Sequence, residues 1–167
     1  MRLVIRKELP VLAGLAKRLK DLTFAMEVIG QYMLGSIHKN FEVGGRPKRW
    51  QRLSEATLKA QFLYGPAGRR KGRRIKTKQR GLSRQWLRFK GGKKILIHTG
   101  RLLQSITYEA LKDKVEIGSN LPYAAIHQFG GWAGRGRKVY IPARPYLVVQ
   151  EEDIDWIKEF LAKELLQ

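Results

Sequence analysis

A stripe of apolar residues in the first quarter of the chain most constrains the fold. Its members recur at intervals of three and four residues, which places them on one face of an α-helix. They are Leu12, Leu15, Leu19, Leu22, Met26, Ile29 and Met33, and Ile37 and Phe41 extend the stripe. Pro10 suits the first turn of this helix and the pair Gly44–Gly45 suits its end. The sequence therefore predicts one helix of about 30 residues, roughly 45 Å long.

Two interpretations of that length stay open. In the first, the stripe lies along the chain's own sheet. In the second, part of it lies against a neighbouring subunit, because a helix of this length exceeds what a small core usually covers. The chain has 167 residues, which suits one domain with a real core.

Shorter elements follow, and their turns are well marked. A short helix capped by Ser54 runs to about Phe62, and a second short helix is indicated around Leu82, Trp86, Leu87 and Phe89. The remaining predictions are a strand at Ile95–Ile97, a hairpin of residues 105–111 and 115–117 across the turn Lys112–Asp113, a helix over Tyr123–Phe129 between Pro122 and Gly130, a strand at Val139–Ile141, and a helix over Pro145–Gln167. This order predicts an α+β fold: a small, mainly antiparallel sheet packed by a long N-terminal helix and a C-terminal helix.

Positive charge gathers in one segment. The chain has 34 Lys and Arg against 14 Asp and Glu, a net charge of +20. Thirteen of the basic residues and no acid lie between Gly65 and Lys94. We interpret residues 65–94 as a basic insertion in a single domain that spans 1–167, with Gly65–Arg80 flexible because Gly- and Arg-rich sequence cannot bury itself. A polyanion or an acidic protein surface is the expected contact of Arg69, Arg70, Lys71, Arg73, Arg74, Lys76, Lys78 and Arg80.

Two aromatic residues lie within the basic segment. Trp86 and Phe89 alternate with Arg84, Arg88 and Lys90, a pattern that suits stacking on exposed nucleic-acid bases. The same pattern also fits aromatic side chains that tether the insertion to the core while the charges stay solvated. Both interpretations stay open at the level of sequence.

Enzyme chemistry has little support in the sequence. The histidines His38, His98 and His127 form no HExxH pair, and we expect His127 to be a packed or hydrogen-bonded structural residue. The acids Glu109, Asp113 and Glu116 lie in or beside the predicted hairpin, where charge is usually solvated. No phosphate-binding loop or nucleophile elbow is present, and cysteine is absent. We therefore expect no catalytic residues, metal or cofactor, and the lack of a long apolar run argues against a membrane partner.

Several motifs carry a resemblance to a known family. Residues 95–106 have the sequence ILIHTGRLLQSI, residues 115–131 VEIGSNLPYAAIHQFGG, and residues 139–147 VYIPARPYL. Upstream, Trp50 begins a W-x-x-L-S-x-x-T element that ends at Thr57. Together these resemble the phage virion morphogenesis family, the tail-completion proteins of Mu-like phages and prophages. More distantly they resemble the head–tail joining and tail-completion proteins of siphophages, which share the TGRL, YA-x-x-H-x-F-G and ARP elements.

The resemblance implies a structural protein that finishes the tail or joins it to the head as a multimer, which we expect to be a ring of identical copies. Its implied neighbours are the tail tube or terminator, or head-neck proteins, with packaged DNA a further candidate for the basic segment. It places the protein in the virion tail or neck, and in the host bacterial cytoplasm during assembly. The motif residues expected to shape the fold and an interface are Thr99, Gly100, Arg101, Leu102, Tyr123, His127, Phe129, Gly130, Arg144 and Pro145.

Local physics adds roles for some of these motif residues. Thr99 is placed to cap a helical turn, Gly100 permits a tight turn, and Arg144 suits a carboxylate partner. The competing function is non-specific nucleic-acid binding through residues 69–94, which explains the charge without the family. A nuclease is a third hypothesis, and the scarcity of acids argues against it.

Overall fold

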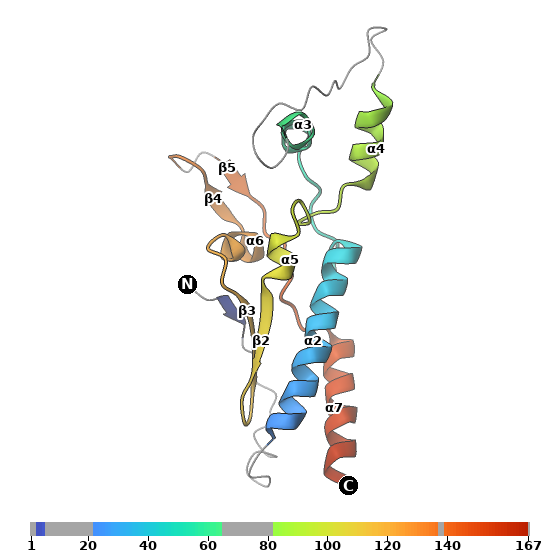
Figure 1. Cartoon of the computed structure of the whole chain (residues 1–167), viewed down its shortest axis with the longest axis vertical. Coiled ribbons are helices and arrows are strands. Elements are labelled where there is room, and N and C mark those ends of the chain that lie inside the picture. Colours follow the sequence, from blue (N-terminus) through green and yellow to red (C-terminus); the bar gives the residue numbers. More distant parts are fainter. Residues whose placement is uncertain (1–2, 6–21, 65–81, 137–138, 167) are drawn as a thin grey trace.

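The fold has a helical side, a small antiparallel sheet and a separate helical lobe (Figure 1). The structure, a computed structural model, describes residues 3–5, 22–64, 82–136 and 139–166. In chain order the elements are β1 (Leu3–Ile5), α2 (Thr23–Val43), α3 (Glu55–Tyr64), α4 (Arg84–Gly92), α5 (Arg101–Gln104), β2 (Ile106–Ala110), β3 (Val115–Ser119), α6 (Ala124–Phe129), β4 (Gly131–Ala133), β5 (Val139–Ile141) and α7 (Glu151–Leu166). The predicted α+β class is confirmed.

Two antiparallel sheets hold the strands. The larger has the order β1-β3-β2, and the hairpin β2–β3 pairs Ile106 with Ser119 and Ala110 with Val115. The smaller sheet pairs β4 with β5. The hairpin and β5 confirm the predictions from alternating residues, whereas β1 and β4 were not predicted. Both have only three residues, too few to show an alternating pattern.

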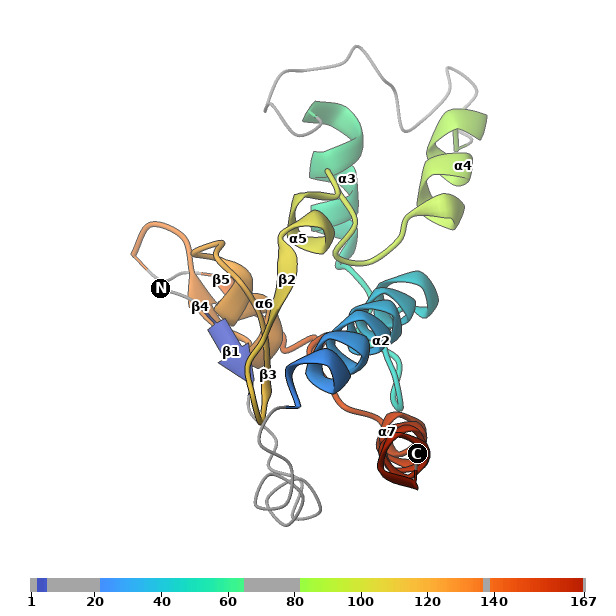
Figure 2. The ribbon, with the colours of Figure 1, turned by 60° about the horizontal axis from the view of Figure 1, so that its bottom comes forward.

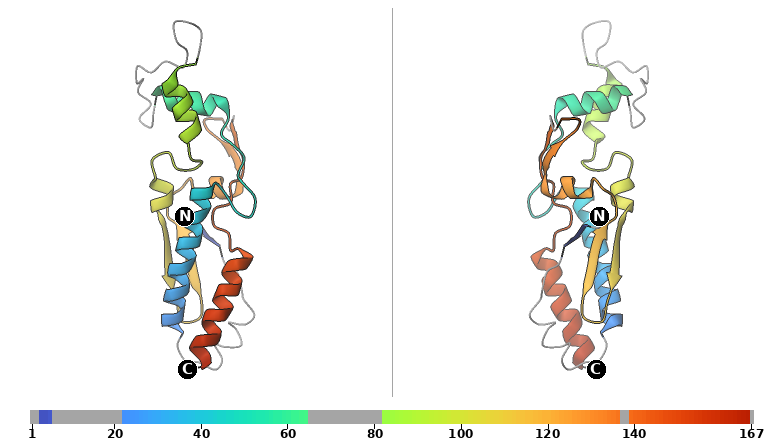
Figure 3. Two further views of the ribbon diagram at one scale, coloured as in Figure 1. Left: turned by 90° about the vertical axis from the view of Figure 1, so that its right-hand side faces the viewer. Right: turned by 90° about the vertical axis from the view of Figure 1, so that its left-hand side faces the viewer.

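Helix α2 lies between the hairpin and α7 (Figure 3). From Leu22 onward the predicted stripe is buried, with Met26, Ile29, Met33, Ile37 and Phe41 at most 5% exposed. The helix ends at Gly44, whose φ of 79° is left-handed and whose N–H donates to the Asn40 carbonyl. This part of the stripe therefore packs inside its own chain. Leu12, Leu15 and Leu19 lie outside the described residues.

Close approach between α2 and β2 depends on one glycine. A Cβ at Gly30 would lie 2.3 Å from Cδ2 of Tyr108, whereas a Cβ at Gly35 would meet nothing within 4 Å. We expect Gly30→Ala to lower the free energy of unfolding by about 2 kcal/mol through overpacking. Gly35→Ala on the same helix should raise it by about 0.5–1 kcal/mol, because alanine suits a helix interior better than glycine. Urea denaturation measures both, and equal stabilities for the two variants would contradict this packing.

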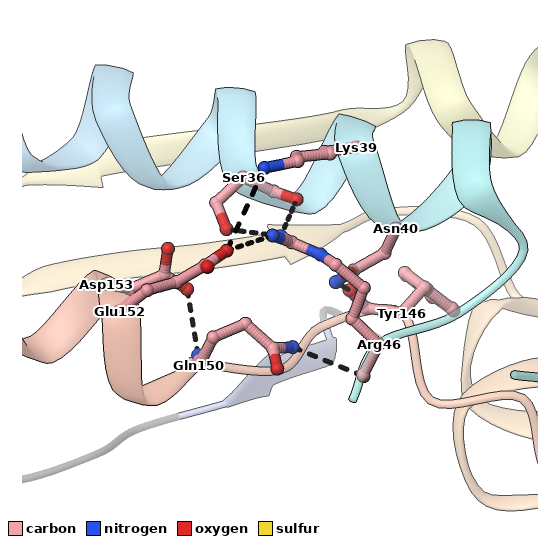
Figure 4. A network of polar contacts seen from close by, with 8 residues as sticks. All are labelled: Ser36, Lys39, Asn40, Arg46, Tyr146, Gln150, Glu152 and Asp153. Carbon is pink, nitrogen blue, oxygen red and sulfur yellow. Dashed lines mark hydrogen bonds and ion pairs between the residues drawn. The ribbon is translucent and has the colours of Figure 1, made fainter. Parts of the chain in front are cut away.

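The end of α2 is tied to the start of α7 by Arg46 (Figure 4). Its guanidinium donates to Asn40 Oδ1 at 2.8 Å and to the Ser36 carbonyl at 2.8 Å, and it contacts the carboxylate of Glu152. Gln150 Nε2 donates back to the Arg46 carbonyl at 3.2 Å. These contacts fix α7 beside α2, so that Ile157 and Leu161 complete the core on that side.

Helices α3 and α4 form a lobe with its own apolar cluster. Phe62 and Trp86 are at most 3% exposed, and their ring centroids lie 5.3 Å apart. The burial of Trp86 favours the tethering interpretation over base stacking for this residue. Ser83 caps α4 and Ser54 accepts from Thr57 N at the start of α3, as serine at a helix start predicts. The predicted insertion over Gly65–Arg80, with all eight of its proposed contact residues, lies outside the described residues.

Three predictions of element bounds were wrong. Helix α2 begins at Thr23 and has 21 residues, with Leu22 as its N-cap, so the stripe does not form one unbroken helix of about 30 residues. Ile95–Ile97 is irregular and not a strand, because Leu96 has a φ of 61° and all three side chains are half-buried against the main core. The last helix starts at Glu151 and not at Pro145, since residues 145–150 are held in an extended path by side-chain hydrogen bonds described below. Leu147 is therefore a core residue ahead of the helix. Among the described residues, no helix is long and apolar enough to cross a membrane.

Candidate interface groove and aromatic ridge

The quoted motifs converge on one groove of about 680 Å³. Its walls are the turn into α3, residues 93–102, helix α6, strand β5 and the segment that follows β5, which meet in the upper half of Figure 1. Thr99, Leu102, Tyr123, His127 and Arg144 all line it. We call this hollow the motif groove. Motifs far apart in sequence thus build one surface feature.

Beside the groove, Gln128 fixes the ARPYL segment to α6. Its Oε1 accepts from Tyr146 N at 2.9 Å and from Leu147 N at 3.0 Å, and its Nε2 donates to the Leu147 carbonyl at 3.1 Å. The Tyr146 hydroxyl donates to the Ala124 carbonyl at 3.2 Å, and burial raises the pKa of Tyr146 to about 12. Gln128 was not predicted from the sequence as a functional residue, although it lies inside the motif of residues 115–131.

Arg144 joins three elements from a buried position. Its backbone N–H donates to the His127 carbonyl at 2.8 Å, and its Nε donates to the Gln51 carbonyl at 3.1 Å. Within the described part of the chain it forms no ion pair, so a carboxylate partner for Arg144 stays a prediction. Burial lowers the pKa of Arg144. The guanidinium is therefore held in place by the Gln51 carbonyl, and the backbone of Arg144 by the His127 carbonyl.

The turn before α5 depends on Gly100 more than on Thr99. Gly100 is the N-cap residue and has a φ of 78°, a left-handed conformation that favours glycine. Thr99 Oγ1 accepts from Arg101 N only at 3.5 Å, which is the long limit of a hydrogen bond. The predicted cap by Thr99 is thus weak. Leu102 is buried in the core and Arg101 is exposed.

Gly130 and Pro145 keep the groove wall against the core. Gly130 has a φ of 74°, and a Cβ there would lie 2.7 Å from Ala143 N. Trp50 Nε1 donates to the Pro145 carbonyl at 2.8 Å, which links the W-x-x-L-S element to the ARP element. These two motif positions are therefore structural.

The groove lining is cationic. It includes Arg52, Lys93, Lys94 and Arg144, and none of its described lining residues is an acid. Lys93 Nζ lies 2.8 Å from His98 Nδ1, and burial lowers the pKa of Lys93. The groove therefore presents several positive charges to whatever enters it.

His127 is held mainly in its neutral form. Burial, followed by the charge of Arg144, lowers its pKa, and its Nδ1 is buried without a hydrogen-bond partner among the described residues. Because the unfolded chain takes up the proton first, this residue should lower stability as the pH falls below about 6.5, the ordinary histidine pKa. This loss of stability should stop increasing once the pH has fallen below the pKa of His127 in the folded chain.

His127→Asn should remove the loss of stability that His127 causes as the pH falls. We expect the variant to gain stability relative to the original chain between about pH 7 and pH 5. Urea denaturation at stepped pH measures this difference. If the free energies of unfolding of the original chain and the variant differ by the same amount at every pH, that result would contradict the buried, neutral state of His127.

An apolar ridge borders the groove. Phe129 and Trp132 are 63% and 61% exposed, and Val139 and Tyr140 are 59% and 57% exposed. The rings of Trp132 and Tyr140 pack edge to face with centroids 5.4 Å apart across the β4–β5 hairpin. We call these four residues the aromatic ridge. Phe129 is one of the predicted interface residues, and Trp132 and Val139 lie in the loop of residues 130–139, which the sequence also predicted to contribute contacts between copies.

The described parts of the chain hold no group of three His, Asp or Glu side chains arranged to bind a metal ion. His38, His98 and His127 lie on different elements, with only His98 and His127 lining the groove. The arrangement is suited to contact with another macromolecule.

The sequence matches the profile of the phage virion morphogenesis family over residues 6–166, which is nearly the whole chain. The chain belongs to the phage virion morphogenesis family. It is also 37% identical over 128 residues to Mu-like prophage FluMu G protein 2 of Haemophilus influenzae, an alignment that covers 77% of this chain and 67% of that protein. No solved structure matches the chain significantly.

Membership gives this virion morphogenesis protein a structural role in building the phage particle and associates it with the virion. The family expectation drawn from the four motifs is thereby confirmed.

Proposed function

We propose that this virion morphogenesis protein completes the phage tail, or joins the tail to the head, as part of a ring of identical copies. The observation that carries the proposal is the exposed aromatic ridge beside the motif groove. Large exposed apolar side chains that gather on one surface are typical of protein interfaces, and aromatic residues supply much of the binding energy there.

The proposed ring is supported by the asymmetry of the surface. Strands β4 and β5, which carry Trp132, Val139 and Tyr140 of the ridge, lie on the side of the molecule away from α7 (Figure 2). A contact that joins two different surfaces of identical chains repeats around an axis, and it closes into a ring when the rotation permits. A tail end or a neck has such rotational symmetry, so a ring of copies suits the place.

The proposed neighbours are further copies of the chain and the tail tube, tail terminator or head-neck proteins. Packaged DNA is a further proposed contact for the basic segment. Within the described residues, that segment contributes the exposed side chains Arg84, Arg88 and Lys90 on α4. Trp86 is buried, which leaves the charges to carry any contact with phosphates.

Deletion of the gene followed by complementation tests the proposal. We expect the deleted phage to produce full heads and separate tails under the electron microscope, and the complementing gene to restore joined particles. Intact, infectious virions from the deleted phage would contradict the proposal.

A further inference from the structure

We propose that the motif groove is an acid-binding site whose occupant is the exposed acidic face of α7 from a second copy of this chain. The inference rests on the proposed function, since it names the contact that would join neighbouring copies in the ring. One side of that contact is the lining of the motif groove and the other is the exposed acidic face of α7, and both consist of described residues.

The receiving surface is the cationic lining of the groove. Arg52 and Lys94 are exposed at its margin, and Lys93 and Arg144 are more deeply placed. With no acid in the described lining, these charges repel one another until an anionic group enters. A hollow of about 680 Å³ is large enough for a few side chains from a partner.

The entering surface is α7, where the acids of the chain gather. Six of the 14 Asp and Glu residues lie in its 16 residues, against only two lysines. Glu151, Asp155 and Glu159 follow one another at intervals of four and are exposed, so they form one stripe along the helix. Asp153, Ile157 and Leu161 face the core instead. The acid stripe thus points away from its own protomer.

Net charge makes this pairing the favoured self-contact. Copies that each carry +20 repel one another, so a contact that pairs a basic surface with an acidic one is favoured among their charged contacts. Helix α7 runs away from α6 and β5 toward the opposite end of the molecule in Figure 1. One protomer therefore cannot fill its own groove with its own helix, and the contact passes from copy to copy.

Recessed charges favour carboxylates over nucleic acid. A duplex presents a continuous row of phosphates and is best met by an exposed row of cations. In the groove, Arg144 is buried and Lys93 is half-buried within a hollow. Separate carboxylates on short side chains reach such positions more easily than a phosphate backbone does.

Charge reversal tests the contact. The pair Arg52→Glu with Lys94→Glu reverses the groove margin, and Asp155→Lys with Glu159→Lys reverses the stripe. We expect each pair to weaken self-association of the purified protein, or its ring formation on tails, by about tenfold or more. All four changes in one chain should restore association to within about threefold of the original.

The direction of the groove effect separates a specific contact from general repulsion. Reversing two groove cations lowers the net charge, so general repulsion alone predicts tighter association. Lys48→Glu with Lys112→Glu is the matched control, because both residues are exposed and lie outside the groove lining. Weakening by the groove pair but not by the control supports the proposal. Equal effects from both pairs, or no rescue in the combined variant, would overturn it.

Cross-linking on particles separates failure of this contact from failure of the proposed function. The chain has no cysteine, so Arg52→Cys and Asp155→Cys introduce the only thiols. We expect a short thiol cross-linker to join neighbouring copies in tails that carry both changes. Rings on tails without that cross-link would overturn the groove contact alone, whereas absence of the protein from tails would contradict the proposed function. Salt-sensitive duplex binding lost in the groove variant, with self-association intact, would assign the groove to DNA instead.

Discussion

Replacing Gln128 with leucine is expected to lower the free energy of unfolding by about 4 kcal/mol. The side chain is 5% exposed and makes three hydrogen bonds to the backbone of Tyr146 and Leu147. Leucine has a similar volume but leaves two buried N–H groups and one carbonyl without partners, each at a cost of about 1–3 kcal/mol. The variant should therefore loosen the segment that leads from β5 to α7.

Urea denaturation measures this loss of stability. We expect the slope of the unfolding free energy against urea concentration to be the same for the variant and the original chain. Gln104→Leu is the control, because Gln104 is exposed on α5, and it should change stability by no more than about 0.5 kcal/mol. If Gln128→Leu lowers the free energy of unfolding by less than about 1 kcal/mol, the hydrogen bonds from Gln128 to residues 146–147 contribute little to stability.

Removing the two rings at the centre of the aromatic ridge should abolish assembly without unfolding the protein. Trp132→Ala combined with Tyr140→Ala deletes side chains that are 61% and 57% exposed, so stability should change little. In an interface, two such anchors contribute about 4 kcal/mol, which is roughly a thousandfold in affinity. We expect a large fall in infectious titre, with heads and tails left unjoined.

Phe24→Ala is the matched control for the ridge. Phe24 is 71% exposed in the first turn of α2, and the start of α2 lies far from β4 and β5 (Figure 1). This variant should keep a normal titre and should co-sediment with tails as the original chain does. Normal assembly of the variant with both ridge substitutions, or an equal defect in Phe24→Ala, would contradict the role of the aromatic ridge as an interface.

Strong local signals explain which elements the sequence predicted well. The stripe from Leu22 to Phe41 and the stop at Gly44 made α2 recognisable, because helix period and a left-handed cap are both local properties. The hairpin over residues 106–119 and the short helix α6 were likewise marked by alternation and by flanking turn residues. Elements of this kind can be predicted without knowledge of the contacts between residues that are distant in sequence.

Long-range contacts explain what the sequence did not predict. Ile95–Ile97 looks like a strand by composition, yet it packs irregularly against the core. Gln128 gives no sign in sequence of its bonds to residues 18 and 19 positions away. The partner of Arg144 is a backbone carbonyl 93 residues away, which no side-chain pattern reveals. The groove itself appears only once three distant motifs are folded together.

Electron cryo-microscopy of the virion tests the central claim most directly. The account predicts a closed ring of this protein at the head-proximal end of the tail, with the aromatic ridge and motif groove of each copy buried in contacts. Virions that lack the protein, or that carry it with the ridge and groove facing solvent, would contradict the account.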